Sequence, residues 1–352
     1  MTEPHGRARR RRAWRAALVL LLASLAPPAA AADPDGAPAG ASAVIFAYRH
    51  FGDEPDPASA ITAEQFEAHL RELRRGGYAV LPVPEIVAAL RDGKPLPPRT
   101  VGITLDDAHA SVYDIAWPRL RAAGLPFTLF VASETIETGA EARMTWDQIR
   151  ELAAAGVTIG NQTAGYPHMI GQDRSYVIGQ IMRAQEELRA MLGTTPKLFA
   201  YPYGEYTTAL RDLVAGMGFD AAFGLQSGVL YPQADRFALP RFTLSDAFGS
   251  LERFRLSADA LPLVVTDVSP ADGVPANNPP DVGFTVDPAM GELDQLACFA
   301  SGVGRTELER VGARRIELRW AEKLPSGRTR INCTLPTPDG RWRWLGLQLS
   351  IP

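Results

Sequence analysis

Two adjacent aspartates follow an apolar run in the first third of the chain. Val101–Leu105 has the composition of a buried strand, and Asp106 and Asp107 come directly after it. Neighbouring side chains on an extended chain point to opposite sides, so one carboxylate can bind a cation while the other acts as a general base. The alternative is that the pair forms only a turn and a helix cap ahead of Ser111. The pair alone leaves both interpretations open.

A second polar segment, Gly-Asn-Gln-Thr-Ala-Gly-Tyr-Pro-His-Met at 160–169, follows the apolar run Val157–Ile159. Gln162 offers an amide oxygen, Tyr166 a phenol and His168 an imidazole. A neutral phenol is a poor zinc ligand compared with imidazole. Together with Asp107, these side chains are the candidate donors for a metal ion.

Short apolar runs alternate with helical patterns from 44 to 262. Repeated strand–helix units predict a parallel sheet, and their number favours a barrel over an open sheet. Active sites of such barrels lie at the carboxyl ends of the strands, where both polar segments stand. The strand candidates are Val44–Tyr48, Val101–Leu105, Phe127–Val131, Val157–Ile159, Leu198–Tyr201 and Ala221–Phe223.

The pattern changes to a period of two in 263–352. Ile316, Leu318 and Trp320 alternate with charged residues, which predicts a small antiparallel β-sandwich of immunoglobulin-like size. Trp342 and Trp344 also alternate, and they form either core or a sugar-binding platform. The later leucines run one residue out of phase with them, which predicts a bulge near Gly346.

The N-terminus has the three parts of a secretory signal peptide in 1–32: a basic start, an apolar run of about ten residues and small residues at the end. The alternative is a transmembrane anchor, but about 20 apolar residues are needed to span a bilayer. Residues 33–43 form a flexible lead-in. We therefore expect an exported protein, periplasmic or extracellular, with no transmembrane helix in the mature chain.

Charge and cysteine content fit export. Removing 1–32 takes away six arginines and one glutamate, which changes the net charge from −4 to −9 and disfavours binding to nucleic acid. The two cysteines, Cys298 and Cys333, form a natural disulfide pair in an exported protein, whereas free thiols are the expectation in the cytoplasm.

Several ordered motifs resemble those of the polysaccharide deacetylases, the NodB-homology group of carbohydrate esterases. Thr104–Ala108 resembles the family's Thr-Phe-Asp-Asp-Gly motif, and Phe199–Gly204 resembles its third motif. Thr145–Ile149 and Leu239–Phe242 stand where the family has similar segments. The resemblance covers about 43–262 and implies a distorted (β/α) barrel that removes N-acetyl groups from a polysaccharide.

The resemblance also implies roles for individual residues. Asp106 would be the general base and Asp107 a ligand of a zinc-like divalent cation. The backbone N–H of Tyr203, beside Tyr201 and Pro202, would help stabilise the oxyanion.

The chain departs from the family pattern at two places. The second motif, His-Ser/Thr-x-x-His-Pro, reads Gln162 to Pro167 here, so both histidine ligands are replaced and His168 is a candidate substitute. Tyr-His-x-Phe on the first strand reads Tyr48-Arg49-His50-Phe51, which leaves His50 as the candidate general acid. Two functions follow: an exported polysaccharide N-deacetylase, or an inactive relative without a metal that binds N-acetylated glycan or serves as a scaffold. The glycan, the metal and the oligomeric state do not follow from the sequence.

Overall fold

A computed structural model of the chain describes residues 1–2, 42–52, 58–138 and 142–352. The expected signal peptide and lead-in lie outside the described residues, apart from residues 1, 2, 42 and 43. No helix in the described ranges is both long and apolar enough to span a membrane.

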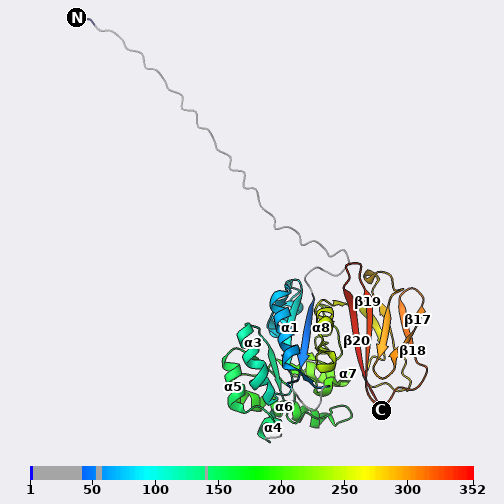
Figure 1. Ribbon diagram of the computed structural model, residues 1–352, viewed down its shortest axis with the longest axis horizontal. Helices are drawn as coiled ribbons and strands as arrows, with labels where there is room; N and C mark the ends of the chain where they lie inside the picture. The colour runs from blue at the N-terminus through cyan, green and yellow to red at the C-terminus, as the bar shows by residue number, and fades with distance from the viewer. Residues whose placement is uncertain (3–41, 53–57, 139–141) are drawn as a thin grey trace. The chain divides into compact units, whose positions relative to one another are not determined.

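A curled sheet, parallel apart from one short strand, forms the centre of the N-terminal part (Figure 1). Its strand order is β10-β1-β5-β6-β7-β8-β9, with β11 beside β1 and β4 beside β5, and only β10 runs antiparallel to its neighbour. The strands are β1 (Ala43–Tyr48), β4 (Ala79–Val80), β5 (Thr100–Leu105), β6 (Thr128–Val131), β7 (Thr158–Asn161), β8 (Leu198–Ala200), β9 (Ala221–Phe223), β10 (Val229–Leu230) and β11 (Phe242–Thr243).

The two ends of this sheet are joined by one short segment, 239–243. Leu239 bridges β9 at Phe223, and three residues later Phe242 pairs with Phe46 of β1. The sheet is therefore curled into a half-barrel, which confirms the mixed α/β fold expected from the alternating pattern. A minor pair of strands, β2 (His50–Phe51) and β3 (Ala60–Ile61), lies outside it.

Helices follow the strands and lie around the sheet (Figure 1). They are α1 (Ala63–Arg75), α2 (Val83–Arg91), α3 (Trp117–Ala123), α4 (Ser133–Glu137), α5 (Trp146–Ala154), α6 (Arg174–Leu192), α7 (Thr208–Ala215) and α8 (Leu251–Ala258). Helix α1 begins with a capping box, in which Thr62 and Gln65 exchange hydrogen bonds between side chains and backbone.

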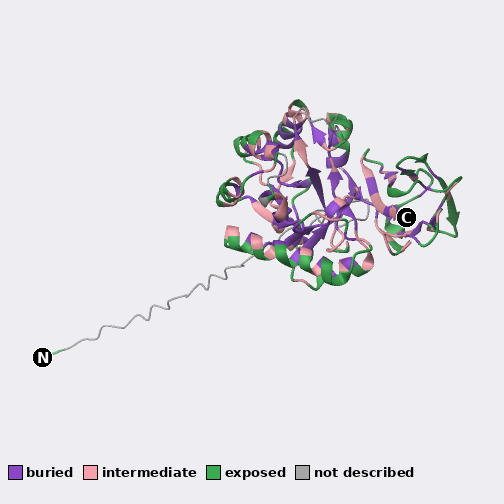
Figure 2. Cartoon of the chain, turned by 90° about the horizontal axis from the view of Figure 1, so that it is seen from below, coloured by how far each residue is buried: buried purple, intermediate pink, exposed green. Residues whose placement is uncertain are grey.

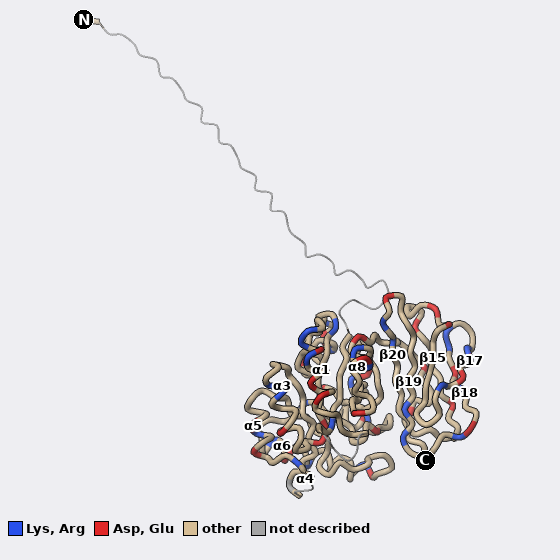
Figure 3. Tube along the Cα trace, viewed as in Figure 1, with Lys and Arg blue, Asp and Glu red and all other residues tan. Residues whose placement is uncertain are grey.

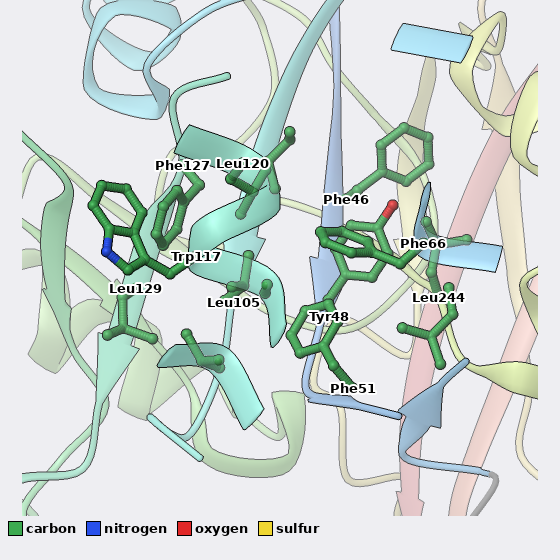
Figure 4. Packing of buried hydrophobic residues seen from close by; sticks show 14 of the residues in the cluster. Phe46, Tyr48, Phe51, Phe66, Leu105, Trp117, Leu120, Phe127, Leu129 and Leu244 are labelled. Carbon is green, nitrogen blue, oxygen red and sulfur yellow. The ribbon is translucent and has the colours of Figure 1, made fainter. Parts of the chain in front are cut away.

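The core of this part lies between the strands and their covering helices, whose outer faces are exposed (Figure 2). Strands β1 and β5 are buried along their whole length, as expected for parallel strands covered on both faces. Figure 4 shows Phe46, Tyr48, Phe51 and Phe66 packed together where α1 meets β1. This packing fixes where β1 ends and so positions the residue that follows Tyr48.

Two β-sheets form the C-terminal part. One has the order β12-β20-β19-β15-β16 and the other β13-β14-β18-β17, and side chains from both make one core cluster. Cys298 of β15 and Cys333 of β19 lie opposite each other and are joined by a disulfide. The strands are β12 (Leu261–Pro262), β13 (Val265–Ser269), β14 (Gly283–Val286), β15 (Ala297–Ala300), β16 (Gly304–Arg305), β17 (Glu307–Val311), β18 (Arg315–Arg319), β19 (Gly327–Pro336) and β20 (Trp342–Ile351).

The predicted bulge near Gly346 is wrong. Strands β19 and β20 pair without interruption. The pairing runs from Gly327, which lies opposite Ile351, to Pro336, which lies opposite Trp342. The phase of the pattern changes because β20 is covered on both faces. Leu349 belongs to the core of the C-terminal part, whereas Trp344 packs edge-on against Phe242 of the half-barrel, with ring centroids 5.1 Å apart. Trp344 is thus core and not a sugar-binding platform.

Candidate functional site

The parallel strands bring the predicted residues together at one edge of the sheet. Strand β5 ends at Leu105 and is followed by Asp106; β7 ends at Asn161 and is followed by Gln162. These strands run in the same direction, so their carboxyl ends meet on one side, called here the carboxyl edge.

Asp106 is held by a buried arginine. The guanidinium of Arg241 donates from Nη1 to Asp106 Oδ1 at 2.7 Å and from Nη2 to Oδ2 at 3.0 Å. Arg241 also donates to Thr104 Oγ1 at 3.1 Å and to the carbonyl of Gly224 at 3.0 Å. A planar guanidinium matches a carboxylate in this two-bonded geometry. These bonds orient the Asp106 carboxylate, and its side chain does not cap a helix.

Asp107 pairs with a different arginine, Arg49, which follows β1. Arg49 Nε donates to Asp107 Oδ2, and the two form a salt bridge. The backbone N–H of Asp107 donates to Gln162 Oε1 at 3.1 Å, and its carbonyl accepts from Arg143 at 2.7 Å. The cation beside Asp107 is therefore a protein side chain, the guanidinium of Arg49.

The charges of this pair respond to burial. Burial raises the pKa of the Asp107 carboxyl, and the guanidinium of Arg49 partly offsets that rise. Burial also opposes the charge on Arg49, but the attraction of Asp107 outweighs it, so the pKa of Arg49 is raised. Both effects of the pairing favour the ion pair over separated charges.

The hydroxyl of Tyr166 accepts a hydrogen bond from the backbone N–H of Tyr203, which was expected to stabilise an oxyanion. The N–H of Tyr203 donates to Tyr166 Oη at 3.3 Å, and the two rings lie 4.7 Å apart. Burial and the nearby carboxylates of Asp107 and Asp106 raise the pKa of the Tyr166 phenol well above its ordinary value. The phenol is therefore neutral and is engaged inside the protein.

The remaining predicted residues lie at different distances from this centre. Tyr201 and Pro202 are buried, and Tyr201 Oη donates to the carbonyl of Phe237 at 2.8 Å. Their side chains therefore pack inside the protein, beneath the loop that carries Tyr203. His168 turns away: its Nδ1 lies 2.8 Å from Glu205 and its ring stacks on Tyr203 at 3.8 Å. His50 lies beside His109, with ring centroids 4.3 Å apart.

The loops of the carboxyl edge contain an unusual number of left-handed residues. Five non-glycine residues there have positive φ: Asp107, Ala108, Thr163, Tyr166 and Tyr203. Side-chain bonds hold this geometry, because Asn161 Oδ1 accepts from the N–H of Thr163 and Thr163 Oγ1 accepts from the N–H of Tyr166. Such conformations cost free energy and concentrate at functional sites.

These residues do not fit a metal ion. Asp107 Oδ1 is buried without a hydrogen-bond partner among the described residues, so one carboxylate oxygen is available. The Gln162 oxygen already accepts an N–H, Tyr166 is a neutral phenol, and Arg49 is itself a cation. In the described part of the chain no three His, Cys, Asp or Glu side chains are grouped to hold a metal. A catalytic zinc site needs three protein ligands and an open position.

A pocket of about 220 Å³ opens at the carboxyl edge. Its polar lining includes Arg49, Asp106, Tyr166 and Tyr203, so it is the place where a ligand would meet the predicted residues. Two more arginines, Arg328 and Arg330, reach the same pocket from β19 of the C-terminal part.

Sequence reasoning did not assign roles to four arginines. Arg49 and Arg241 stand in quoted motifs, so their positions were visible although their partners were not. Arg328 and Arg330 lie about 125 residues beyond Tyr203 in the chain, and no motif connects them to the carboxyl edge.

A curled parallel sheet with polar residues gathered at its carboxyl edge is the architecture of a (β/α)-barrel enzyme domain. Residues 93–222 match the family model described as polysaccharide deacetylase. The likeness to the polysaccharide deacetylase family is thus shown for residues 93–222, less than half of the chain.

Relatives of known sequence agree with this assignment. A putative polysaccharide deacetylase of Bacillus subtilis, YxkH, is 24% identical over 195 residues, which are 54% of this chain and 69% of that protein. The poly-beta-1,6-N-acetyl-D-glucosamine N-deacetylase of Escherichia coli is 25% identical over 198 residues, 45% of this chain. The match spans only 30% of the length of the E. coli protein.

Solved structures share the fold. IcaB from Ammonifex degensii superimposes with a TM-score of 0.55 at 26% identity, covering 62% of this chain and 97% of that one. The deacetylase PplD of Streptococcus pyogenes gives a TM-score of 0.57 at 20% identity, covering 62% and 98%.

Proposed function

We propose that this chain is an exported protein that binds a polysaccharide at the carboxyl edge and leaves its N-acetyl groups in place. The observation that carries the proposal is the salt bridge between Arg49 and Asp107. It puts a permanent cation against the carboxylate that, by resemblance, would hold a catalytic metal.

A guanidinium does not replace a metal in amide hydrolysis. A bound metal lowers the pKa of water and so generates a nucleophile at neutral pH, and it polarises the carbonyl. Arg49 neutralises Asp107, but it has no coordination position for water and it does not give up its proton. We therefore derive no hydrolytic step through a metal here.

The oxyanion position supports the same interpretation. An N–H donor stabilises a tetrahedral intermediate only if it points at the developing charge. The N–H of Tyr203 is instead bonded to Tyr166 Oη. An acetyl group would have to displace the Tyr166 phenol before it reached this donor.

The ligand class comes from the family. The E. coli and Staphylococcus relatives are named as N-deacetylases of poly-beta-1,6-N-acetyl-D-glucosamine. This chain has a pocket between left-handed loops at the carboxyl edge, so we propose that an N-acetylated polysaccharide is bound there.

The second candidate is deacetylation itself, and the position of Asp106 favours it. This carboxylate lines the pocket and is oriented by Arg241, as a general base requires. One set of assays separates the two candidates.

The test uses the purified chain and three measurements: bound metal by elemental analysis, acetate release from N-acetylglucosamine oligomers with added Zn²⁺, Co²⁺ or Ni²⁺, and oligomer binding by calorimetry with and without chelator. We expect no stoichiometric metal, no acetate, and binding that the chelator does not change. Stoichiometric metal with acetate release that Asp106→Ala abolishes would establish the deacetylase instead.

A further inference from the structure

Strand β19 of the C-terminal part supplies two arginines to the pocket of the half-barrel. Arg328 and Arg330 are two residues apart on one strand, so their side chains leave the same face of the sheet. Gln348 lies opposite Arg330 on β20. This face of the β19–β20 ladder is the one that meets the carboxyl edge.

Several contacts fix the ladder against Tyr203. Arg328 Nη1 donates to the carbonyl of Tyr203 at 3.1 Å, and Gln348 Nε2 donates to the same oxygen at 3.2 Å. Arg328 also lies 3.6 Å from the carboxylate of Glu205 and faces the Tyr203 ring at 5.5 Å. Arg328 is therefore a held side chain with a charge partner.

Arg330 has no such partner. Its backbone bonds to Ser301 and pairs within the ladder, but its guanidinium makes no hydrogen bond or ion pair with any described residue. Burial and the neighbouring charge of Arg328 lower the pKa of Arg330, yet an arginine remains charged at neutral pH. A half-buried cation without an anion is costly, and an anion that entered the pocket would offset that cost.

The charge of the pocket contrasts with that of the chain. Among the described residues, the lining has three arginines, Arg49, Arg328 and Arg330, and one acid, Asp106, which is paired with Arg241. Arg49 is paired with Asp107 and Arg328 with Glu205. The chain as a whole has a net charge of −4, and its acidic and basic residues are interspersed along the described trace (Figure 3). Within the described lining, Arg330 is therefore the guanidinium that has no carboxylate partner.

We propose that this pocket binds a negatively charged substituent of a saccharide, with Arg330 as its main partner. The inference rests on the proposed function, glycan binding, and adds the chemical class of the glycan: an acidic one that carries carboxylate or sulfate groups. Arginine is suited to both, because its planar fork donates two parallel hydrogen bonds to such oxygens.

The size of the pocket agrees with one sugar unit. Its volume of about 220 Å³ is below the roughly 300–1,000 Å³ of pockets that enclose drug-sized ligands. The rest of an acidic chain would then run along the rim in solvent. The ring of Tyr166 and the side chain of Leu225 add apolar surface for the C–H face of a sugar.

The test compares tetramers of galacturonate, galactose 6-sulfate, neutral galactose and N-acetylglucosamine by calorimetry at low salt. We expect at least one acidic tetramer to bind about tenfold or more tightly than the neutral ones, and higher salt to reduce this difference. Comparison of the two acidic tetramers tells carboxylate from sulfate.

Variants assign the effect to Arg330. Arg330→Gln should remove the preference for the acidic tetramer, and Arg330→Lys should keep part of it because the charge remains. The matched control is Arg305→Gln, which removes an exposed arginine from β16 of the same part and should change nothing. Circular dichroism checks that each variant is folded.

The outcomes separate this inference from the function on which it rests. If acidic and neutral tetramers bind equally, or if Arg330→Gln and Arg305→Gln behave alike, the anionic site is refuted while glycan binding stands. If no tetramer binds, both are refuted. Metal-dependent acetate release alone refutes the proposed function, and the preference for acidic glycan then describes the substrate.

Discussion

Arg49 determines what can happen at Asp107. It follows β1 directly and lines the pocket, its Nε pairs with Asp107 Oδ2, and 39% of the Arg49 side chain is exposed. A metal would have to compete with a tethered cation that cannot diffuse away. Two features therefore distinguish this site from a metal site: the absence of imidazoles at 162 and 166, and the guanidinium of Arg49 beside Asp107.

This view predicts the outcome of restoring the imidazoles. Gln162→His with Tyr166→His gives Asp107 two nitrogen ligands, but we expect little zinc binding because Arg49 still pairs with the carboxylate. Adding Arg49→Ala should raise zinc affinity by about tenfold or more, since a good ligand set is then free of a competing charge. Calorimetric zinc titration measures both variants.

Arg49→Ala alone is the control and should bind no zinc, because it leaves one carboxylate without imidazoles. If the double variant already binds zinc as tightly as the triple variant, then Arg49 does not block the site.

The residues that the sequence identified and those that it missed differ in kind. Asp106, Asp107, Gln162, Tyr166 and Tyr203 were expected together because each follows a strand, and parallel strands end at one edge. Which side chain pairs with which was not predictable. The direction of Arg49 depends on where β1 ends, and that depends on the packing of Tyr48 and Phe51 under α1.

At the scale of elements, the segment 239–243 connects the two ends of the sheet. Arg241 of this segment bonds to Asp106 and Thr104 on one side and to Gly224, just after β9, on the other. One buried side chain thus joins the ends of β5 and β9, and it also holds the half-barrel in its curled form.

Breaking this connection should be costly. Arg241 is fully buried, so Arg241→Met leaves Asp106 as a buried charge without its partner, and we expect a loss of about 3–5 kcal/mol in the free energy of unfolding. Removing both charges in Arg241→Met/Asp106→Leu should recover much of that loss. Urea unfolding measures both, and equal destabilisation of the single and double variants would contradict this account.

Helix α1 contributes a pH-dependent contact. His69 is buried on this helix, its Nε2 lies 2.8 Å from the carbonyl of Gly249, and its Nδ1 lies 3.1 Å from the hydroxyl of Tyr48. A neutral ring satisfies both if Nε2 donates and Nδ1 accepts. Burial lowers the pKa of His69 from 6.5 to about 4, although the bond to Gly249 opposes this.

The sign of the pH effect follows from that shift. Between pH 6.5 and about pH 4, His69 is protonated in the unfolded chain but neutral in the folded chain. The stabilisation is complete above pH 6.5 and is lost as the pH falls towards 4, by about 2–3 kcal/mol in total. Urea unfolding at pH 7.5 and 4.5 should show this loss in the native chain and not in His69→Gln.

The control for this comparison is Arg305→Gln, which introduces the same residue at an exposed position of β16. It should keep the pH dependence of the native chain. A pH dependence of His69→Gln as large as that of the native chain would mean that other groups cause it.

Elements were predicted well where they were long and apolar. The main strands agree with expectation because the burial pattern that predicts them is local. Two-residue strands such as β10 and β11 had no signal of their own. Their pairing is imposed by the closure of the sheet, which is a non-local effect.

At the scale of the whole described fold, the C-terminal part shapes the pocket of the half-barrel. The sequence separated the two parts by their periods and did not reveal that one contributes to the pocket of the other. The out-of-phase residues of β20 were the available signal. They were interpreted as a bulge, whereas they mark a strand with two buried faces, one of which carries Trp344, Gly346 and Gln348 against the half-barrel.

Gly346 is the position where this contact between the parts is tightest. A Cβ at Gly346 would lie 1.9 Å from the carbonyl oxygen of Ser227 and 2.7 Å from its nitrogen, and backbone atoms do not yield as a flexible side chain does. Gly346→Ala should therefore push β20 away from the half-barrel. The Cys298–Cys333 disulfide and the separate core of the C-terminal part keep that part folded.

The consequence of this displacement should appear in binding. Arg328 and Arg330 reach the pocket only while the ladder is docked, so Gly346→Ala should reduce the preference for an acidic tetramer about as much as Arg330→Gln does. Gly179→Ala is the matched control, because a methyl there meets no atom within 4 Å. If Gly346→Ala binds the acidic tetramer as the native chain does, the anionic site does not depend on docking, and its arginines must be sought within the half-barrel, starting with Arg49.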